Sequence, residues 1–417
     1  MLTALKKERK IMKKGLEGKR VVLCVCGGIA AYKSVEVLRL LQRQGAKVRV
    51  IMTQGAKEFV APLTFEALSS EPVFISVFDK SDSIPMRHID WAREADAVIV
   101  APATANILGK IANGIADDAM TTFMMAVRAP VLLCPAMNTY MYESRAVQRN
   151  IDTLESDGFQ VVEPGSGELA CGEIGVGRFP DPWIIVDRLL ALLTPKDLMG
   201  IKLLVTAGPT QEPIDPVRFI TNPSSGKMGF AIAKMAEYRG ADVTLVSGPV
   251  ILPDPLNVTC IRTQTTHEME QEVLSRFQGM DVVIKSAAVA DYRVDNPSVH
   301  KIKKDSDHLI LNLVKNTDIL KELGKVKTRQ ILVGFAAETR DLVENAQKKV
   351  RQKNLDMIVA NIVGDKSSGF GIDTNIVKFL YKNGEREDLP SMPKENVAML
   401  LLDRIKDMMV RDKKGRA

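Results

Sequence analysis

The feature that most constrains the fold of this 417-residue chain is a strand–loop–helix–strand pattern near its middle. A short apolar run at 203–206 stops at Ala207-Gly208-Pro209, and a polar loop then leads through 224–229 into an amphipathic stretch. A second apolar run follows at 243–246 and again ends in small residues and proline. Apolar runs of this length, bounded by turn residues and separated by a helical pattern, are typical of buried parallel strands. The region therefore predicts the beginning of a parallel α/β domain.

The N-terminal part of the chain repeats this pattern. It predicts a strand at 21–25, a turn at Gly27-Gly28, a helix at 30–44 and a second strand at 48–52. The length is too great for one ordinary domain and comfortable for two. The expected fold class is therefore α/β, with two Rossmann-like parallel-sheet domains. The expected division is a basic N-terminal extension at 1–20, a first domain at 21–193, a linker at 194–200 and a second domain at 201–417.

Composition narrows the class of partner. The net charge is +6, and Lys and Arg are interspersed with Asp and Glu, so the charge pattern does not indicate nucleic-acid binding. The five cysteines form an odd set without metal-ligand spacing, which favours free thiols in a reducing cytoplasm. No apolar run is long enough to predict a membrane span. We expect a cytoplasmic protein that binds small molecules, without a membrane, nucleic-acid or protein-held metal partner.

Small or polar residues follow successive strands of the first domain. Thr53 ends one strand, the strand at 95–100 runs into the loop 101–106, and the strand at 131–134 runs into 135–138. Ligands of parallel sheets bind at the carboxyl ends of strands, where small residues admit a ligand to the backbone and a helix N-terminus favours phosphate. No G-x-G-x-x-G pattern is present, so a standard dinucleotide site is not predicted.

Two residues of this half have chemistry of their own. His88, taken alone, is most simply an ordinary surface or capping histidine. Cys171 lies in the glycine-rich segment 165–178, where an exposed loop is expected, so it is either a functional thiol or an incidental one.

Five sequence blocks in the first half resemble the flavin-dependent cysteine decarboxylases. They are GGIAAYK at 27–33, HID at 88–90, APATANILGKIANGIADD at 101–118, PAMNTYM at 135–141 and ACGEIGVGR at 170–178. More specifically, they are similar to the decarboxylase half of the bifunctional coenzyme A biosynthesis proteins. This family joins phosphopantothenoylcysteine decarboxylase to phosphopantothenate–cysteine ligase.

The resemblance implies a flavodoxin-like flavoprotein domain with FMN as its cofactor. The residues implied to bind FMN are Gly28, Thr53, Thr104 and Asn106. The resemblance further implies His88 as a catalytic base, Cys171 as a proton donor, and Asn138 and Met141 as substrate-binding residues, with Asn138 also catalytic. Trp91, Tyr142 and Phe179 depart from the residues usual in the family, and we expect them to alter the shape of the pocket rather than its chemistry.

The resemblance continues through the second half, in the family's order. The blocks lie at 206–229, 286–294, 301–304, 315–320 and 333–339. They imply a nucleotide-binding ligase domain that uses CTP with Mg2+, in which Lys301 and Asn222 are catalytic and Arg218 and Asn222 hold the acyl intermediate. The residues implied to bind CTP are Asp291, Lys301, Thr317, Asp318, Ile319, Leu320, Phe335, Lys349 and Lys353.

Read without the family, these residues leave more alternatives open. The segment 300–304 and the pair Lys349 and Lys353 also fit solvated surface charge. The segment at 315–318 predicts a helix start with Asn316 or Thr317 as N-cap. A P-loop ATPase is disfavoured, because the spacing G-x-x-x-x-G-K-[ST] is absent.

The expected function is therefore a step pair in coenzyme A biosynthesis. CTP-dependent ligation of cysteine to 4′-phosphopantothenate through an acyl-cytidylate would precede FMN-dependent decarboxylation to 4′-phosphopantetheine. The resemblance also implies a homo-oligomer, with trimeric flavin halves and dimeric ligase halves. The alternatives are a single-function flavoprotein, such as a flavin prenyltransferase with an inert second domain, and a non-catalytic nucleotide-sensing protein.

Overall fold

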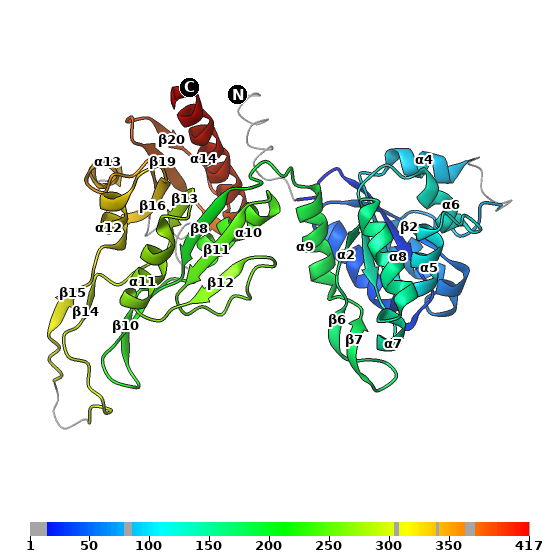
Figure 1. The fold of residues 1–417 in the computed structure, drawn as a ribbon, viewed down its shortest axis with the longest axis horizontal. Helices are drawn as coiled ribbons and strands as arrows, with labels where there is room; N and C mark the ends of the chain where they lie inside the picture. The colour runs from blue at the N-terminus through cyan, green and yellow to red at the C-terminus, as the bar shows by residue number, and fades with distance from the viewer. Residues whose placement is uncertain (1–14, 79–85, 304–307, 339–341, 363–371, 417) are drawn as a thin grey trace. The chain divides into compact units, whose positions relative to one another are not determined.

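The computed structural model describes residues 15–78, 86–303, 308–338, 342–362 and 372–416. It divides into two compact units between Thr194 and Pro195, and each is described by itself (Figure 1). Most of the expected N-terminal extension lies outside the described residues, as does Lys304 of the predicted nucleotide-binding blocks. Within the described part of that extension, Leu16 is fully buried in the core of the first unit.

The N-terminal unit is built on a five-stranded, wholly parallel sheet in the order β2-β1-β3-β4-β5. Counted along the chain, this order is that of the flavodoxin-like doubly wound sheet, in which the strand order reverses between β1 and β3. The expected α/β class is confirmed. The strands are β1 (Arg20–Val25), β2 (Lys47–Met52), β3 (Ala97–Ala103), β4 (Val131–Pro135) and β5 (Gln160–Val161).

Helices cover both faces of this sheet, which explains why its strands are mostly apolar. Alternate residues of β1 point to opposite faces, so Val21, Leu23 and Val25 join one buried cluster while Cys24 and Cys26 join the other. The first cluster is closed by α2 (Ser34–Arg43), α3 (Pro62–Ser69) and α9 (Pro182–Leu193), of which α2 and α9 lie side by side. The second is closed by α4 (Arg87–Glu94), α5 (Ala105–Ala112), α6 (Ala119–Ala126) and α8 (Arg145–Ser156).

Short elements occupy the carboxyl edge of the same sheet. Two 3-10 turns, η1 (Ile29–Lys33) and η2 (Gln54–Glu58), follow β1 and β2, and the one-turn helix α7 (Thr139–Tyr142) follows β4. The hairpin of β6 (Gly165–Glu168) and β7 (Ile174–Arg178) lies beside α7 (Figure 1).

The C-terminal unit contains an eight-stranded sheet in the order β12-β11-β8-β13-β16-β17-β19-β20. The first six are parallel, and in chain order they read 3-2-1-4-5-6, the Rossmann arrangement with its switch point between β8 and β13. The last two pair antiparallel. The strands are β8 (Lys202–Ala207), β11 (Asp242–Ser247), β12 (Thr259–Arg262), β13 (Val282–Lys285), β16 (Ile331–Glu338), β17 (Met357–Ile362), β19 (Val377–Tyr381) and β20 (Arg386–Asp388).

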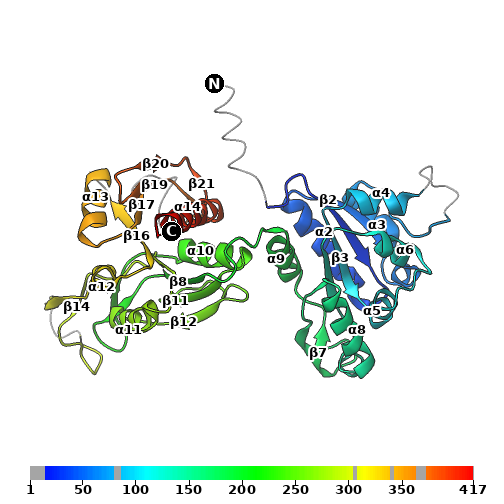
Figure 2. The same ribbon diagram turned by 45° about the horizontal axis from the view of Figure 1, so that its top comes forward.

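Helices again lie on both faces. A buried cluster joins the sheet to α11 (Thr266–Phe277), α12 (Ile319–Val326) and α13 (Leu342–Gln352). On the other side α14 (Lys394–Arg416) runs alongside α10 (Lys227–Tyr238), as Figures 1 and 2 both show. Three two-stranded ladders complete the unit: β9 (Gln211–Pro213) with β10 (Phe219–Thr221), β14 (Tyr292–Val294) with β15 (Leu313–Lys315), and β18 (Thr374–Asn375) with β21 (Met392–Pro393). The β14–β15 ladder extends away from the sheet (Figure 1).

The segment expected as a linker is bonded to the C-terminal unit. Arg239, which is 3 % exposed, donates to both carboxylate oxygens of Asp197 at 2.8 Å and to Asp403 of α14 at 2.7 Å. The hydrogen bond from Arg239 lowers the pKa of Asp197 to about 2, against the opposing effect of burial, and Lys406 adds to the lowering. The chain around residue 197 is therefore held by ion pairs on the C-terminal unit. No helix among the described residues is long and apolar enough to cross a membrane.

Candidate active sites

A cavity of about 1120 Å³ opens at the carboxyl edge of the N-terminal sheet. Loops that follow β1, β2, β3 and β4 form its wall, on both sides of the point where the strand order reverses. Open parallel sheets bind ligands in such a crevice. Seven of the residues predicted from the family resemblance line it: Gly28, Thr53, Thr104, Asn106, Asn138, Met141 and Cys171.

Part of the cavity wall is bare backbone. A Cβ on Gly27 would lie 2.6 Å from the carbonyl carbon of Gly55, so the loops after β1 and β2 meet this closely only because residue 27 is glycine. Gly177 has a φ of 131°, and a Cβ there would lie 2.2 Å from the carbonyl oxygen of Met137. All four residues line the cavity, where a flat ligand can rest directly on the main chain.

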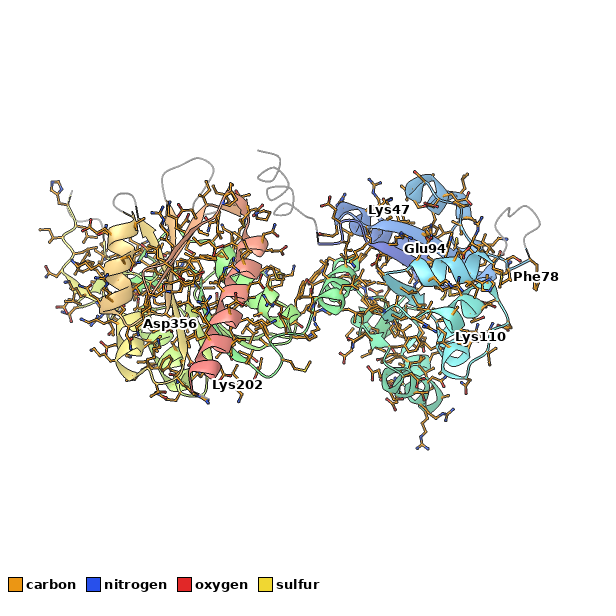
Figure 3. The ribbon with its side chains drawn as sticks, turned by 90° about the horizontal axis from the view of Figure 1, so that it is seen from above. Lys47, Phe78, Glu94, Lys110, Lys202 and Asp356 are labelled. Carbon is orange, nitrogen blue, oxygen red and sulfur yellow. The ribbon has the colours of Figure 1, made fainter. Side chains whose placement is uncertain are left out.

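Polar and charged groups gather on the same wall. Thr104 begins α5 and its hydroxyl oxygen accepts a hydrogen bond from the backbone N–H of Ile107 at 3.4 Å, so the first turn of α5 lines the cavity. Lys33 and Lys110 line it as well, and Figure 3 labels Lys110 on α5. Asp117, 2.6 Å from Lys110, raises the pKa of that lysine. A helix start, two cations and an apolar floor fit a cofactor with a flat ring system and a phosphate.

A thiol, an amide and a carboxylate meet at the rim of this cavity. The side-chain NH2 of Asn138 donates to the Glu173 carboxylate at 2.7 Å and approaches the Cys171 sulfur at 3.5 Å. The Cys171 thiol in turn lies 3.6 Å from the same Glu173 oxygen. Asn138 precedes α7, whereas Cys171 and Glu173 come from the turn of the β6–β7 hairpin. Glu173 is not among the residues predicted from the sequence, although a carboxylate two residues after the proposed thiol was a usable signal.

His88, which the family resemblance implies as the catalytic base, does not line this cavity. It is half-buried at the start of α4, and it is not among the described residues that line the cavity. The helix α4 belongs to the sheet face that carries α5, α6 and α8. A catalytic role of His88 within its own protomer's cavity is therefore not supported by this geometry.

The three departures from the family pattern differ in their consequences. Phe179 is buried and lines the cavity, so it does shape the wall as expected. Trp91 packs edge-on against Phe74 with ring centroids 5.9 Å apart, and neither Trp91 nor Tyr142 lines the cavity. The expectation of an altered pocket shape was wrong for these two residues, because their rings pack into the core between helices and sheet.

In the C-terminal unit, the corresponding site lies at the switch point between β8 and β13. The hydroxyl of Thr206 accepts from the backbone N–H of Ala287 at 3.1 Å, and that of Thr210 accepts from Ala290 at 2.9 Å. These bonds hold the loop after β13 against the loop after β8. A smaller cavity of about 160 Å³ lies at the same edge, where its lining residues are Ser224, Ser225, Gly226, Lys227, Met228, Ser286, Ala287, Ala288, Phe335, Ala336, Asn361, Asn375 and Lys394.

Asn222 is fixed to the same loop. Its side-chain NH2 donates to the carbonyl oxygens of Ala288 at 3.2 Å and Val289 at 3.0 Å. The amide hydrogens are therefore engaged with the backbone, and the side-chain oxygen is the group left for a ligand. This contact gives Asn222 a positioning role beside the one the resemblance implies.

A buried carboxylate brings together two other predicted residues. Asp215, which is 3 % exposed, accepts backbone N–H groups from Val217, Arg218 and Ile302. The Arg218 side chain also donates to the Ile302 carbonyl at 3.3 Å. Burial raises the pKa of Asp215, but the backbone donors outweigh it and the net pKa is lowered. Arg218 and the segment that carries Lys301 are thereby held side by side.

The predicted helix start at 315–318 is present, one residue later than expected. The N-cap of α12 is Asp318, which accepts from the backbone N–H of Lys321 at 3.1 Å, so the assignment to Asn316 or Thr317 was wrong. Asn316 instead donates to the Ala290 carbonyl at 2.9 Å and so anchors the loop after β13.

Several predicted CTP-binding residues lie around this helix start. Lys353 forms an ion pair with Asp318 at 2.7 Å. The side chains of Ile319 and Leu320 are buried in the core, which leaves only their backbone for a ligand. Asp291 and Lys301 are exposed in loops, and Lys349 is half-buried on α13.

Lys285 is a charged residue of this site that the sequence analysis did not select. It ends β13 on the same sheet face as Val283, which packs against α12 and α13. Burial lowers the pKa of Lys285 to about 8 and the charge of Lys353 adds to this, while Asp318 and Asp291 act in the opposite direction. The signal in the sequence was a lysine that ends an otherwise apolar strand.

Comparisons with known proteins agree with a two-domain architecture. Residues 9–194 match the flavoprotein family model, and residues 198–409 match the model of the DNA/pantothenate metabolism flavoprotein C-terminal domain. The coenzyme A biosynthesis bifunctional protein CoaBC of Bacillus subtilis (strain 168) is 49% identical over 394 residues, which are 94% of this chain and 97% of that protein. The protein of the same name from Escherichia coli (strain K12) is 47% identical over 395 residues, with the same coverage of 94% and 97%.

A solved structure of the C-terminal domain of a coenzyme A biosynthesis bifunctional protein CoaBC is 47% identical, with a TM-score of 0.45. It covers 52% of this chain and 99% of that domain. The near full-length relatives do not support the two alternatives, a single-function flavoprotein and a nucleotide sensor. The chain belongs to the family of coenzyme A biosynthesis bifunctional proteins and is both a decarboxylase and a ligase.

Proposed function

We propose that the two carboxyl-edge sites carry out consecutive reactions on one substrate. The C-terminal site joins cysteine to 4′-phosphopantothenate with CTP through an acyl-cytidylate, and the N-terminal site converts the product to 4′-phosphopantetheine with release of carbon dioxide. The observation that carries the proposal is the meeting of the Asn138 amide and the Cys171 thiol on the wall of a cavity that suits a flat cofactor. We place the enzyme in the cytoplasm, where free thiols persist.

In the N-terminal site, Gly28, Thr53, Thr104 and Asn106 would hold FMN. When bound, FMN supplies the oxidation of the thiol-bearing carbon that makes loss of the neighbouring carboxylate feasible, and it returns the electrons afterwards. The Asn138 amide donates to the substrate carboxylate and so orients it. Cys171 donates a proton to the carbon next to the one that is reduced.

His88 requires a second protomer in this scheme. Its own cavity does not include it, so we propose that His88 acts as the base in the cavity of a neighbouring protomer of the expected trimer. The test mixes two variants that are each expected to lack formation of saturated 4′-phosphopantetheine, His88→Asn and Cys171→Ser, and it measures that product. If His88 acts between protomers, mixed trimers contain some intact sites and recover part of the parent activity. Mixtures that stay inactive after exchange of protomers would refute the assignment.

In the C-terminal site, the problem is that a carboxylate is a poor electrophile and must be activated. Lys301 and Lys353 would neutralise the triphosphate of CTP, which binds together with Mg2+. Cations at the phosphates also balance the negative charge that develops when the cytidylyl group is transferred to the carboxylate. Arg218 lies beside the Lys301 segment through Asp215, so both cations approach the same substrate. Asn222 holds the loop after β13 that faces them. We propose dimeric association of these domains, as the family resemblance implies.

The experiment follows both reactions in the purified full-length chain. Sustained pyrophosphate release is expected only when CTP, 4′-phosphopantothenate and cysteine are all present. Carbon dioxide release from added 4′-phosphopantothenoylcysteine is expected without CTP, from a protein with the absorbance of a flavin. Sustained pyrophosphate release that does not depend on cysteine, or a colourless protein that releases carbon dioxide, would refute the proposal.

A further inference from the structure

The group that is proposed to hold the substrate carboxylate is already bound to a carboxylate. The Asn138 NH2 donates to the Glu173 side chain at 2.7 Å, which is the short distance typical of a hydrogen bond to a charged acceptor. Asn138 is one of the residues that line the cofactor cavity. A residue of the protein thus occupies the donor that the substrate needs.

The orientation of this amide follows from its surroundings. The side-chain oxygen of Asn138 accepts from the backbone N–H of Tyr140 at 2.9 Å and caps α7. The NH2 group must therefore face away from α7, toward the β6–β7 hairpin. The backbone N–H of Met137 also donates to Gly177 of that hairpin at 3.0 Å, so the two segments are joined next to the amide.

The turn of the hairpin delivers the carboxylate and the thiol together. The backbone N–H of Leu169 donates to the Glu173 carbonyl at 2.8 Å, and that of Gly172 donates to the Leu169 carbonyl at 2.9 Å. Gly172 has a φ of 84°, a value that favours glycine. This tight turn presents Cys171 and Glu173, two residues apart, to the same amide.

We propose that the Glu173 carboxylate is a built-in competitor in the decarboxylase site, which the substrate carboxylate must displace from Asn138. Binding exchanges one carboxylate for another, and two carboxylates at one donor repel each other, so Glu173 must withdraw when substrate enters. After carbon dioxide has left, the product has no carboxylate, and Glu173 returns to the amide. The inference rests on the proposed function in one respect, the role of Asn138 as the donor to the substrate carboxylate.

This exchange predicts different effects on substrate and product. Without Glu173, substrate meets an open amide and binds more tightly. Product does not need to displace Glu173, so its affinity is independent of this side chain. A hairpin residue that only shaped the cavity would alter both affinities by the same factor.

The experiment compares the parent chain with Glu173→Ala, Glu173→Gln and the control Glu163→Gln. Glu163 is exposed ahead of the hairpin and does not line the cavity, so its replacement makes the same charge change elsewhere. For each protein we would measure the KM and kcat for carbon dioxide release from 4′-phosphopantothenoylcysteine, and the inhibition constant of 4′-phosphopantetheine. All proteins are used as the full-length chain loaded with FMN.

We expect the KM of Glu173→Ala to fall about three- to tenfold, which is the range for one hydrogen bond to a charged group after partial replacement by water. The KM of Glu173→Gln should lie between those of the parent chain and Glu173→Ala. The inhibition constant of the product should stay within a factor of two in all variants. An unchanged or raised KM in both Glu173 variants, or a product constant that falls in parallel with KM, would overturn the role of Glu173. A parent chain that releases no carbon dioxide would overturn the proposed function and this inference together.

Discussion

Lys285→Met is expected to make the C-terminal domain more stable near neutral pH. Lys285 ends a central strand of the sheet, and burial holds its pKa at about 8 rather than at its ordinary value of 10.5. A pKa depressed in the folded state means that the charged form is disfavoured there. Methionine has a similar length and fills the same space without a charge.

The magnitude follows from the two pKa values. Because one pKa unit corresponds to about 1.36 kcal/mol, the change from 10.5 to about 8 sets an upper limit of roughly 3 kcal/mol on the penalty. The side chain is partly exposed, and solvent screening reduces this, so we expect a gain of about 1–3 kcal/mol at pH 7.

The sign of the pH dependence is specific to a lysine whose pKa is lowered. Below pH 8 the lysine is charged in both the folded and the unfolded chain, and the full penalty is present. Between pH 8 and 10.5 the folded chain loses the proton first, so the unfolded state binds more protons and the free energy of unfolding of the parent rises with pH. The advantage of Lys285→Met should therefore shrink across this window.

The assay uses the position of the tryptophans. Trp91 and Trp183 are the two in the chain, and both lie in the N-terminal domain. In urea titrations, tryptophan fluorescence reports on that domain alone, whereas far-ultraviolet circular dichroism reports on both. The variant should shift the transition of the C-terminal domain, which dichroism reports and fluorescence does not, to higher urea at pH 7 and less so at pH 10. The fluorescence transition should stay unchanged. A destabilised variant, or a gain of equal size at both pH values, would refute the reasoning.

Four further changes test other parts of the structure. Cys171→Ser should keep carbon dioxide release but lose most of the saturated product, because a hydroxyl is a far weaker acid than a thiol. Mass spectrometry of the product under anaerobic conditions tests this, and saturated product at the parent rate would contradict the role of Cys171 as proton donor. Lys301→Gln should reduce pyrophosphate release by about tenfold or more, a loss of about 1.4 kcal/mol or more of transition-state stabilisation. Decarboxylation of added substrate should stay intact. Normal ligase turnover in the variant would exclude a catalytic role of Lys301. Asn222→Asp places a carboxylate against two backbone carbonyls, so activation of the carboxylate and amide formation should both slow. Single-turnover kinetics separates the two steps. A defect in amide formation alone would show that the contact of Asn222 with the loop after β13 is unimportant. Asp197→Asn should destabilise the C-terminal domain by about 2 kcal/mol above pH 4, since one pKa unit is about 1.36 kcal/mol. This difference in stability should vanish as the pH falls through the folded pKa of about 2. Equal urea midpoints of parent and variant at pH 7 would contradict a stabilising role of the ion pair between Asp197 and Arg239.

Much of the fold was predictable from local patterns. Apolar runs such as 21–25 and 203–206, each with a glycine two positions after its end, specify buried parallel strands, because apolar residues can be covered on both faces of a sheet. The position of the cofactor cavity followed as well, since the carboxyl ends of neighbouring parallel strands must meet at one edge. The family could be recognised from blocks of sequence in a shared order, and the similarity to a relative extends over 94% of the chain.

Other features depended on tertiary structure. The contact of Glu173 with Asn138 spans 35 positions, and that of Asp215 with Ile302 spans 87. The sequence predicted Asn316 or Thr317 as the N-cap of α12, but Asp318 is the N-cap in the structure. Its side chain also forms an ion pair with Lys353, which lies C-terminal to α13.

The placement of His88 and Lys285 shows the same limit. The family resemblance identified His88 as a candidate, but the face of the sheet to which α4 packs keeps it off the cavity wall. Lys285 looked like the end of a strand, yet its burial, and with it its charge near neutral pH, depends on how α12 and α13 close over that face. Strand periodicity and turn chemistry act over a few neighbouring residues and can be read from the chain. The distances between side chains from remote segments, which set hydrogen bonds and pKa values, exist only after helices and sheet have packed.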